Sequence, residues 1–273
     1  MKRTVLITGC SSGIGEALAH NFLKAGWTVY ATARNTDALH TLTSLGAHPV
    51  PMDLMDEASV TAAVDHVHAH APHIDMLINN AGYGAMGPMA EMPVDELRRQ
   101  FQANLFGQMA VIQAVVPSMI ENGRSHIINI GSVSGILPTP FSGAYASSKA
   151  AFHAVSDALR LELAPFGISV VTVQPGGIAS RFSANAEAQL KETTRNLNHY
   201  AASMDAIIRR TRISQESAMP LDQFADKLTA TLLKDSIPPV IRLGTHSRLL
   251  PFLQKWIPTR RRDAILMKKF KLK

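Results

Sequence analysis

The chain has 273 residues, of which 46% are hydrophobic and 18% charged, so it can form one large globular domain with a sizeable core. Its net charge of +6 is uneven: residues 242–273 hold ten basic residues and one acid, whereas residues 1–241 hold 17 basic and 20 acidic residues. A mildly acidic body argues against binding of nucleic acid, and the single cysteine excludes an internal disulfide and fits a reducing compartment.

We expect neither a secretory signal nor a membrane-spanning helix. The apolar run that follows Met1-Lys2-Arg3 ends at Gly9, which makes it too short for a signal peptide. No apolar run approaches the roughly 18 residues that a spanning helix needs. These features predict a cytoplasmic protein.

A glycine-rich turn joins the first predicted strand, residues 3–8, to a helix that starts near Ile14. The turn reads TGCSSGIG over residues 8–15. Its glycines would let the backbone approach a pyrophosphate, and the helix N-terminus would offer free N–H groups and the positive end of its dipole. The sequence therefore predicts a dinucleotide site, with a plain tight turn as the alternative.

The second predicted strand, residues 27–33, ends without the acid that binds the ribose hydroxyls of NAD. Arg34 follows instead, and its guanidinium could pair with the 2′-phosphate of NADP. This favours NADP(H) over NAD(H), unless Arg34 is a surface residue that contacts nothing.

A helix over residues 35–45, capped by Asn35, and a strand over residues 47–51 come next. Asp53 follows this strand. Its carboxylate could accept a hydrogen bond from an adenine amino group, or it could only cap or turn the next segment.

Residues 56–70 predict a helix whose end is rich in histidine. His66 and His70 lie four apart and could in principle bind a metal ion. Because no cysteine or carboxylate completes a ligand set, we interpret the histidines as a solvated helix end and expect no metal.

The fourth predicted strand, residues 74–78, leads to Asn80, which can brace the centre of the sheet, and to Ala81-Gly82, where a cofactor could pass close to the backbone. A long helix over residues 93–121 follows, with Asn104 inside its apolar pattern. Asn104 is either a core amide satisfied by backbone, a helix kink, or a group that holds a water or a carbonyl near the site.

The fifth predicted strand, residues 125–131, leads to Ser132, and the next helix, residues 143–163, carries Tyr145 and Lys149. Residues four apart share a face of a helix, so an ammonium would lie near a phenol. The cation would lower the pKa of the phenol from its usual ~10 toward the working range. Ser132 could hold a substrate oxygen against the Tyr145 hydroxyl.

Strands and helices alternate up to a sixth strand, residues 168–173. This order predicts a three-layer, doubly wound parallel sheet of Rossmann type, in a single domain over residues 1–242. Residues 181–219 should form a polar, helical lid over the substrate, containing Arg209, Arg210 and Arg212. No basic residue is obviously placed to bind a substrate carboxylate.

Two apolar segments, residues 83–89 and the segment around Leu137 and Phe141, could line the substrate pocket, or could be ordinary core. The C-terminal extension, residues 243–273, interleaves apolar and basic residues and contains Trp256. It could lie on an anionic membrane surface, or it could pack on the domain with a solvated basic face.

Six motifs resemble, in order and spacing, those of the classical short-chain dehydrogenases/reductases, closely over residues 3–180 and more loosely to residue 242. They are the turn at 8–15, Asn79-Asn80-Ala81-Gly82, Asn104, Ser132, Tyr145 with Lys149, and Pro175-Gly176. The resemblance implies that Tyr145 is the general acid/base and that Lys149 lowers its pKa and binds the nicotinamide ribose. It further implies that Ser132 positions the substrate oxygen and that Asn104 supports a water relay.

The resemblance also implies a set of cofactor-binding residues: Gly9, Ser11, Ser12, Gly13, Ile14, Gly15, Arg34, Asp53, Asn80, Ala81, Gly82, Tyr145, Lys149, Pro175, Gly176, Ile178 and Ser180. Arg34 after Ala33 resembles the NADP-preferring members. Two departures are Ser12, where many of these members carry a basic residue, and Ser180, where the family often has threonine.

Residues 29–34 and the long extension are most similar to members that act on retinoids, steroids or fatty aldehydes. We therefore expect an NADP(H)-dependent oxidoreductase that interconverts a lipophilic carbonyl and its alcohol. Members often pair through the helices at 93–121 and 143–164, which implies a homodimer or homotetramer. The alternatives are a nucleotide sensor without catalysis and a peripheral membrane scaffold.

Overall fold

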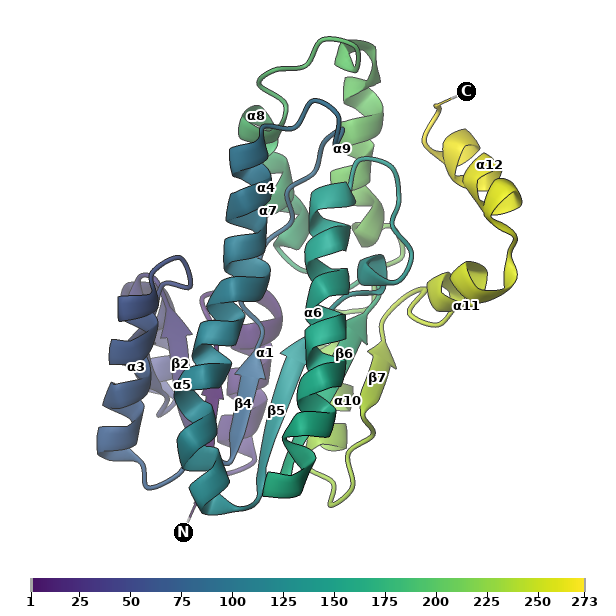
Figure 1. The fold of residues 1–273 in the computed structure, drawn as a ribbon. Helices are drawn as coiled ribbons and strands as arrows, with labels where there is room; N and C mark the ends of the chain where they lie inside the picture. Colours follow the sequence, from purple (N-terminus) through teal and green to yellow (C-terminus); the bar gives the residue numbers. More distant parts are fainter. Residues whose placement is uncertain (1, 273) are drawn as a thin grey trace.

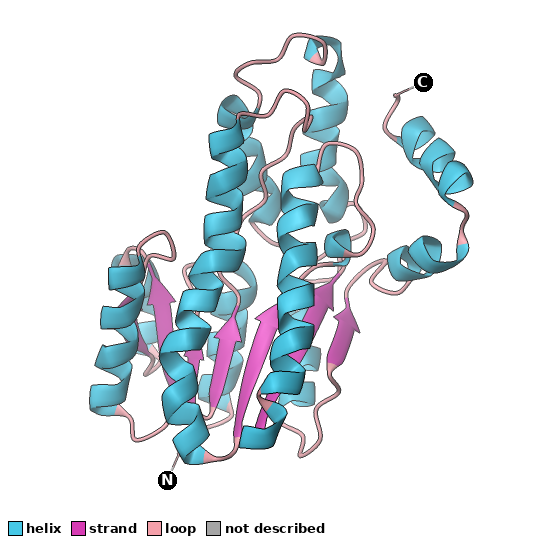
Figure 2. Ribbon diagram, viewed as in Figure 1, coloured by secondary structure: helices cyan, strands magenta, loops and turns pink. Residues whose placement is uncertain are grey.

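The computed structural model describes residues 2–272, which fold around a parallel sheet with strand order β3-β2-β1-β4-β5-β6-β7 (Figures 1 and 2). Helices cover both faces, so the predicted doubly wound sheet is confirmed. The strand order reverses between β1 and β4, and such a reversal opens a crevice at the carboxyl ends of the strands. The strands are β1 (Thr4–Ile7), β2 (Thr28–Ala33), β3 (His48–Pro51), β4 (Met76–Asn79), β5 (Ser125–Ile130), β6 (Ile168–Pro175) and β7 (Val240–Leu243).

One face of the sheet carries α1 and α10, and the other carries α3, α5 and α6 (Figure 1). The helices are α1 (Gly13–Lys24), α2 (His40–Ser44), α3 (Glu57–His70), α4 (Val94–Phe101), α5 (Gly107–Asn122), α6 (Gly143–Glu162), α7 (Phe182–Ala188), α8 (Leu190–Thr193), α9 (Met204–Arg212), α10 (Leu221–Leu232), α11 (Leu249–Trp256) and α12 (Thr259–Lys269). Short 3-10 segments lie at Thr36–Leu39, Val133–Gly135, Ala164–Phe166, Ala201–Ser203 and Ile213–Gln215.

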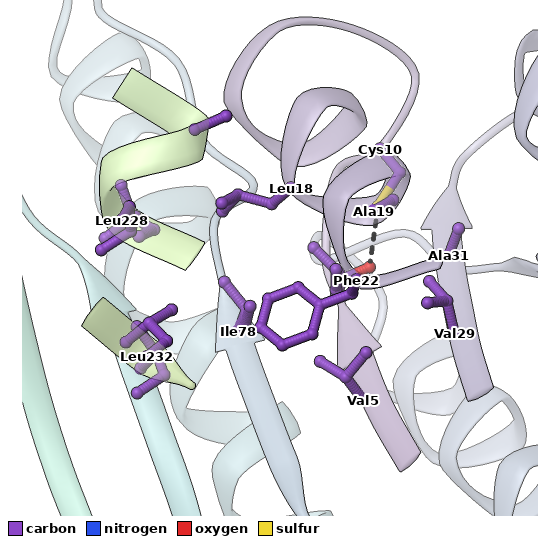
Figure 3. Packing of buried hydrophobic residues seen from close by; sticks show 14 of the residues in the cluster. Val5, Cys10, Leu18, Ala19, Phe22, Val29, Ala31, Ile78, Leu228 and Leu232 are labelled. Atoms are coloured by element: carbon purple, nitrogen blue, oxygen red, sulfur yellow. Dashed lines mark hydrogen bonds between the residues drawn. The ribbon is translucent and has the colours of Figure 1, made fainter. Parts of the chain in front are cut away.

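The central strands are buried on both faces, which is why they read as continuous apolar runs without alternation. Phe22 of α1 is completely buried between Val5 and Ile78 of the sheet and Leu228 and Leu232 of α10 (Figure 3). This contact between α1 and α10 fixes where α1, and therefore the turn before it, sits on the sheet.

Two predicted helices differ in detail from the structure. Residues 35–45 form a 3-10 segment followed by the short α2, although Asn35 does cap the segment, because its side chain accepts a hydrogen bond from the Asp37 N–H. Residues 93–121 form α4 and α5 joined by a π-helical segment, Gln102–Phe106, which contains Asn104. Such π segments often occur at functional sites.

The expectation that no segment could span a membrane was wrong as regards length and composition. Within residues 2–272, one helical run, Val94–Asn122, is long and apolar enough. In the structure this run packs against α3 and α6, and Val111, Ile112 and Val115 are buried against the sheet. It is therefore a core helix of this fold.

The sequence did not reveal β7 or α10. β7 is a short edge strand, Val240–Leu243, preceded by two prolines, and only Ile241 in it is buried. Proline and brief length are typical of edge strands, and both weaken the sequence signal.

Candidate active site

The glycine turn lies at the carboxyl end of β1, as predicted. Gly9 has φ of +72°, and a Cβ there would lie 2.8 Å from the Cα of Ala81. A Cβ on Gly15 would meet the Gly9 carbonyl oxygen and the Asn80 side chain. Any side chain at these positions would push the turn away from β4.

Asn80 ties the ends of β1 and β4 together. Its Nδ2 donates to the carbonyl oxygens of Thr8 (2.9 Å) and Gly9 (3.1 Å). The Thr8 hydroxyl accepts from the backbone N–H groups of Asn80 and Ala81. The predicted bracing by Asn80 is thus present, and it holds Ala81 and Gly82 beside the turn.

A cleft separates the start of α1 from the segment after β6. Ser11, Ser12, Gly13 and Glu16 line one side, and Ala179, Ser180, Arg181 and Leu221 line the other. Ser12 stands at the N-cap of α1, but its side chain makes no capping bond, so the first N–H groups of the helix stay free. Free N–H groups beside glycines fit the pyrophosphate of a dinucleotide.

Four further predicted cofactor residues lie in the first turn of α1 or at the end of β6 and just after it: Ile14, Pro175, Gly176 and Ile178. Ile14 is in the first turn of α1 and packs on the core. Pro175 ends β6, and the Gly176 N–H donates to the Leu243 carbonyl oxygen (2.8 Å). The Ile178 carbonyl oxygen accepts from the Gln215 side chain, and the Ser180 N–H donates to the same side chain. Gln215 therefore orders the segment that carries both residues.

Arg34 and Asp53 follow β2 and β3 at the same edge of the sheet. Arg34 is exposed, and no ion pair holds it within residues 2–272. The Asp53 carboxylate accepts from the Met55 N–H (3.0 Å), so it does turn the next segment. The adenine contact of Asp53 stays a prediction.

Tyr145 and Lys149 lie in the first turns of α6, with Ser132 beside them after β5, and all three side chains are buried. Burial raises the pKa of Tyr145, whereas hydrogen bonding from Ser132 and the charge of Arg210 lower it. The Lys149 ammonium donates to the Ile130 carbonyl oxygen (2.7 Å), and burial lowers the pKa of Lys149 to about 8. Burial is thus the main influence on the Tyr145 pKa. The lowering of this pKa by Lys149 stays a prediction.

Asn104 is a fully buried amide on the π segment. Its Oδ1 accepts from the Tyr83 N–H (3.1 Å), and its Nδ2 donates to the Tyr83 carbonyl oxygen (3.0 Å) and to the Ser148 hydroxyl (3.1 Å). The sequence analysis offered a core amide satisfied by backbone and a helix kink as two interpretations. The structure agrees with the first, and it places Asn104 where the helix deviates from α geometry. The water relay stays a prediction.

His153, which we did not single out from the sequence, supports Ser132. Its Nε2 accepts from the Ser132 backbone N–H (3.3 Å). Burial and the charge of Lys149 lower the pKa of His153 to about 4, so the ring stays neutral and can accept this bond. His153 lies four residues after Lys149 on α6, and that spacing was the available signal.

Residues of α7, α8 and α9, of two loops and of the segment after α12 form an apolar cluster around Tyr145. Its buried members are Met86, Phe141, Tyr145, Ala186, Leu190, Ile207 and Phe270. The Tyr145 and Phe182 rings are 5.1 Å apart. Met86 and Phe141 belong to the two segments that the sequence suggested as pocket lining. Phe270, directly after α12, is 1% exposed and was not expected here.

Residues 2–272 contain no group of three histidine, cysteine or acidic side chains that could hold a metal ion. His70, one of the two histidines considered, bonds through Nδ1 to the His66 carbonyl oxygen (2.7 Å). This bond is compatible with a helix end.

The structure is a doubly wound α/β protein with a glycine turn at the carboxyl end of β1 and a buried tyrosine at the start of α6. A family model described as short chain dehydrogenase matches residues 3–191. The chain therefore belongs to the short-chain dehydrogenase/reductase family, whose fold implies binding of a nicotinamide cofactor, and it is an oxidoreductase.

Three curated relatives are similar to this chain. The chain is 40% identical over 186 residues, 68% of this chain and 69% of the relative, to "Uncharacterized oxidoreductase YbbO" of Escherichia coli (strain K12). It is 30% identical over 260 residues, 95% of each chain, to "Probable short-chain type dehydrogenase/reductase VdlC" of Helicobacter pylori. A third relative, 32% identical over 82% of this chain and 76% of the relative, is "NADPH-dependent 1-acyldihydroxyacetone phosphate reductase" of Schizosaccharomyces pombe.

Solved structures share the fold. A short-chain dehydrogenase from Streptomyces avermitilis superposes with a TM-score of 0.82 at 27% identity, covering 99% of this chain and 97% of that one. A 3-ketoacyl-(acyl-carrier-protein) reductase from Brucella melitensis complexed with NADH has a TM-score of 0.73 at 26% identity, covering 88% and 95%. A serine dehydrogenase complexed with NADP+ has 0.74 at 25% identity, covering 90% and 96%. Both forms of the nicotinamide cofactor thus occur among similar structures.

Proposed function

We propose that the protein is an NADP(H)-dependent oxidoreductase that interconverts a lipophilic aldehyde or ketone with its alcohol. The observation that carries this proposal is the Tyr145 hydroxyl, which is buried beside Ser132 within an apolar cluster. An apolar wall favours a retinoid, steroid or fatty aldehyde type of substrate over a small polar one.

The chemistry divides between cofactor and protein. When bound, the nicotinamide supplies a hydride to the carbonyl carbon, or accepts one from the alcohol carbon. In the reductive direction Tyr145 donates its proton to the substrate oxygen, and Ser132 holds that oxygen by a hydrogen bond. Because burial keeps the Tyr145 pKa high, the phenol carries its proton at neutral pH and is ready to act as the acid.

The cofactor preference is tested at Arg34. Arg34→Gln should lower kcat/KM with NADPH by about 30-fold and leave the value with NADH nearly unchanged, because a charge-assisted bond to the 2′-phosphate contributes about 1.5–3 kcal/mol. Initial rates with both cofactors measure this effect. The matched control is Arg98→Gln, an exposed arginine that pairs with Asp95. A wild-type kcat/KM that is higher with NADH than with NADPH would overturn the preference.

We also propose that the protein is cytoplasmic and touches membranes through its extension. Leu249, Phe252 and Trp256 of α11 are exposed, the last to 63%. A surface hollow beside them is lined by Phe252 together with Arg242, Arg248 and Lys255. Apolar and cationic side chains on one surface complement an anionic lipid surface.

A vesicle sedimentation assay tests this contact. The full chain should bind phosphatidylserine-containing vesicles at low salt, and Phe252→Ser with Trp256→Ser should weaken binding about tenfold or more, since burial of each aromatic side chain contributes about 1.5–3 kcal/mol. Phe166→Ser, at an exposed aromatic residue on another surface, serves as the control. Wild-type protein that stays in the supernatant with acidic vesicles at low salt would rule the contact out.

We propose further that two copies pair through α5 and α6. Phe106, directly before α5, is 55% exposed, and Leu161 near the end of α6 is 68% exposed. Exposed apolar side chains on α6 and directly before α5 fit the pairing that the family resemblance implies. Light scattering after gel filtration should give a dimer or tetramer, and Phe106→Glu with Leu161→Glu should shift it to monomer; a wild-type monomer at micromolar concentration would contradict this.

A further inference from the structure

Arg210 is a buried cation that forms no ion pair with any acidic side chain among residues 2–272. It lies on α9 and is 5% exposed. Its Nε donates to the Thr139 hydroxyl (2.8 Å), and within residues 2–272 nothing accepts a bond from its two Nη groups. The neighbouring arginines differ, because Arg209 is exposed and Arg212 pairs with Glu187 at the surface.

Burying an arginine without a counter-charge destabilises the folded protein. Buried charges in proteins are almost always paired, since loss of hydration is offset only by a close counter-charge. Burial lowers the pKa of Arg210 to about 10, which still leaves the guanidinium charged at neutral pH. An anionic group from outside residues 2–272 that bonded to the Nη groups would offset this cost.

The position of Arg210 suggests that the substrate supplies this negative charge. Ile207, one turn earlier on α9, is in the apolar cluster with Tyr145, so Arg210 extends from the same face of the lid. Thr139, its hydrogen-bond partner, lies in the loop that leads into α6. Thr139 also bonds to Ser142, the residue before α6, so this loop links the guanidinium to the start of the helix that carries Tyr145.

We propose that Arg210 binds a carboxylate or phosphate group of the substrate of this site. The substrate would then be amphiphilic, with its carbonyl at Tyr145, its apolar part against residues such as Phe141 and Leu190, and its anionic group at Arg210. This inference rests on the proposed function and narrows it. Both anions accept two N–H bonds from a guanidinium side by side, which is the geometry that the Nη groups offer.

Substrates matched in chain length test the proposal. We would compare a long-chain aldehyde that ends in a carboxylate, its methyl ester, and the aldehyde that ends in a phosphate. Wild-type enzyme should show a higher kcat/KM for an anionic aldehyde than for the ester. Arg210→Gln should lower the anionic value about 30-fold or more, through KM, and leave the ester within about threefold. The anion with the larger loss is the one that the site takes.

Two variants separate anion binding from a structural role. Arg209→Gln, at the exposed neighbour, should change neither value. Arg210→Lys keeps the charge but loses the planar pair of donors, so it should restore only part of the anionic preference. Equal losses on anionic and neutral aldehydes in a folded Arg210→Gln enzyme would show that Arg210 only ties α9 to Thr139, and would overturn the proposal. If the wild-type enzyme has the same kcat/KM for the ester as for both anionic aldehydes, the proposal is also overturned. This outcome does not depend on whether the variant folds.

A binding measurement keeps this test separate from the proposed function. A long-chain carboxylate should raise the unfolding temperature of the wild-type protein more than the corresponding alcohol does, and Arg210→Gln should abolish that difference. Failure to oxidise NADPH with every aldehyde, the ester included, would contradict the proposed function. A carboxylate that stabilises the protein no better than the alcohol would contradict the role of Arg210 alone.

Discussion

Tyr145→Phe is expected to lower kcat by about 10³-fold while leaving the affinity for NADPH nearly unchanged, because general acid catalysis contributes about 10²–10⁴-fold. The change removes a single oxygen and keeps the ring, which packs against Phe182. Steady-state rates with a long-chain aldehyde and fluorescence titration with NADPH measure the two effects.

The matched control is Tyr200→Phe, which removes a hydroxyl from another tyrosine packed on the same apolar cluster, edge-on against Phe141. It should keep kcat within about twofold, since surface or partly buried changes away from the chemistry have small effects. If Tyr145→Phe kept more than a tenth of the wild-type rate, Tyr145 would not be the acid. A wild-type protein that binds NADPH but reduces no carbonyl would favour the nucleotide-sensor alternative.

Lys149→Met is expected to lower kcat/KM by about 100-fold or more, the usual effect of removing a preorganised donor. The wild-type pH profile gives a second readout. Because the pKa of Lys149 is about 8 in the folded protein, its positive charge is present below pH 8 and is lost above it. Wild-type kcat/KM should therefore fall as the pH rises through about 8, and the variant should lack this fall.

The free energy of unfolding should change with pH in the direction opposite to the activity, because Lys149 is a buried cation. The pKa of Lys149 is lower in the folded protein than its ordinary value of 10.5, so between pH 8 and 10.5 the unfolded chain binds more protons. The contribution of Lys149 to the free energy of unfolding therefore rises with pH between pH 8 and 10.5. Lys149→Met removes a buried charge, so it should remain folded at pH 7, as thermal unfolding will show. A flat wild-type activity profile between pH 7 and 9 would argue against the charge of Lys149.

Most of the sheet could be predicted from the sequence, because its central strands are buried on both faces and each is followed by a turn of distinctive composition. The positions of the glycine turn, Asn80 and Ser132 at the carboxyl ends of β1, β4 and β5 follow from that order alone. The short edge strand β7 and the helix α10 lack such signals.

The burial of Arg210 could not be predicted with the same ease. In the sequence it is one of three arginines within four positions, and each could equally face solvent. Only the packing of α9 on the cluster around Tyr145 decides which one enters the interior. The three-residue spacing from Ile207 was a weak signal, because single pairs of this kind occur on many helices.

The burial of Phe270 has a practical consequence for how the protein is prepared. Phe270, in the segment after α12, is buried in the same cluster as Tyr145. Shortening the chain before this residue would remove apolar packing from the surroundings of Tyr145. Activity measured on a chain shortened in this way would then describe an enzyme whose catalytic tyrosine has altered surroundings.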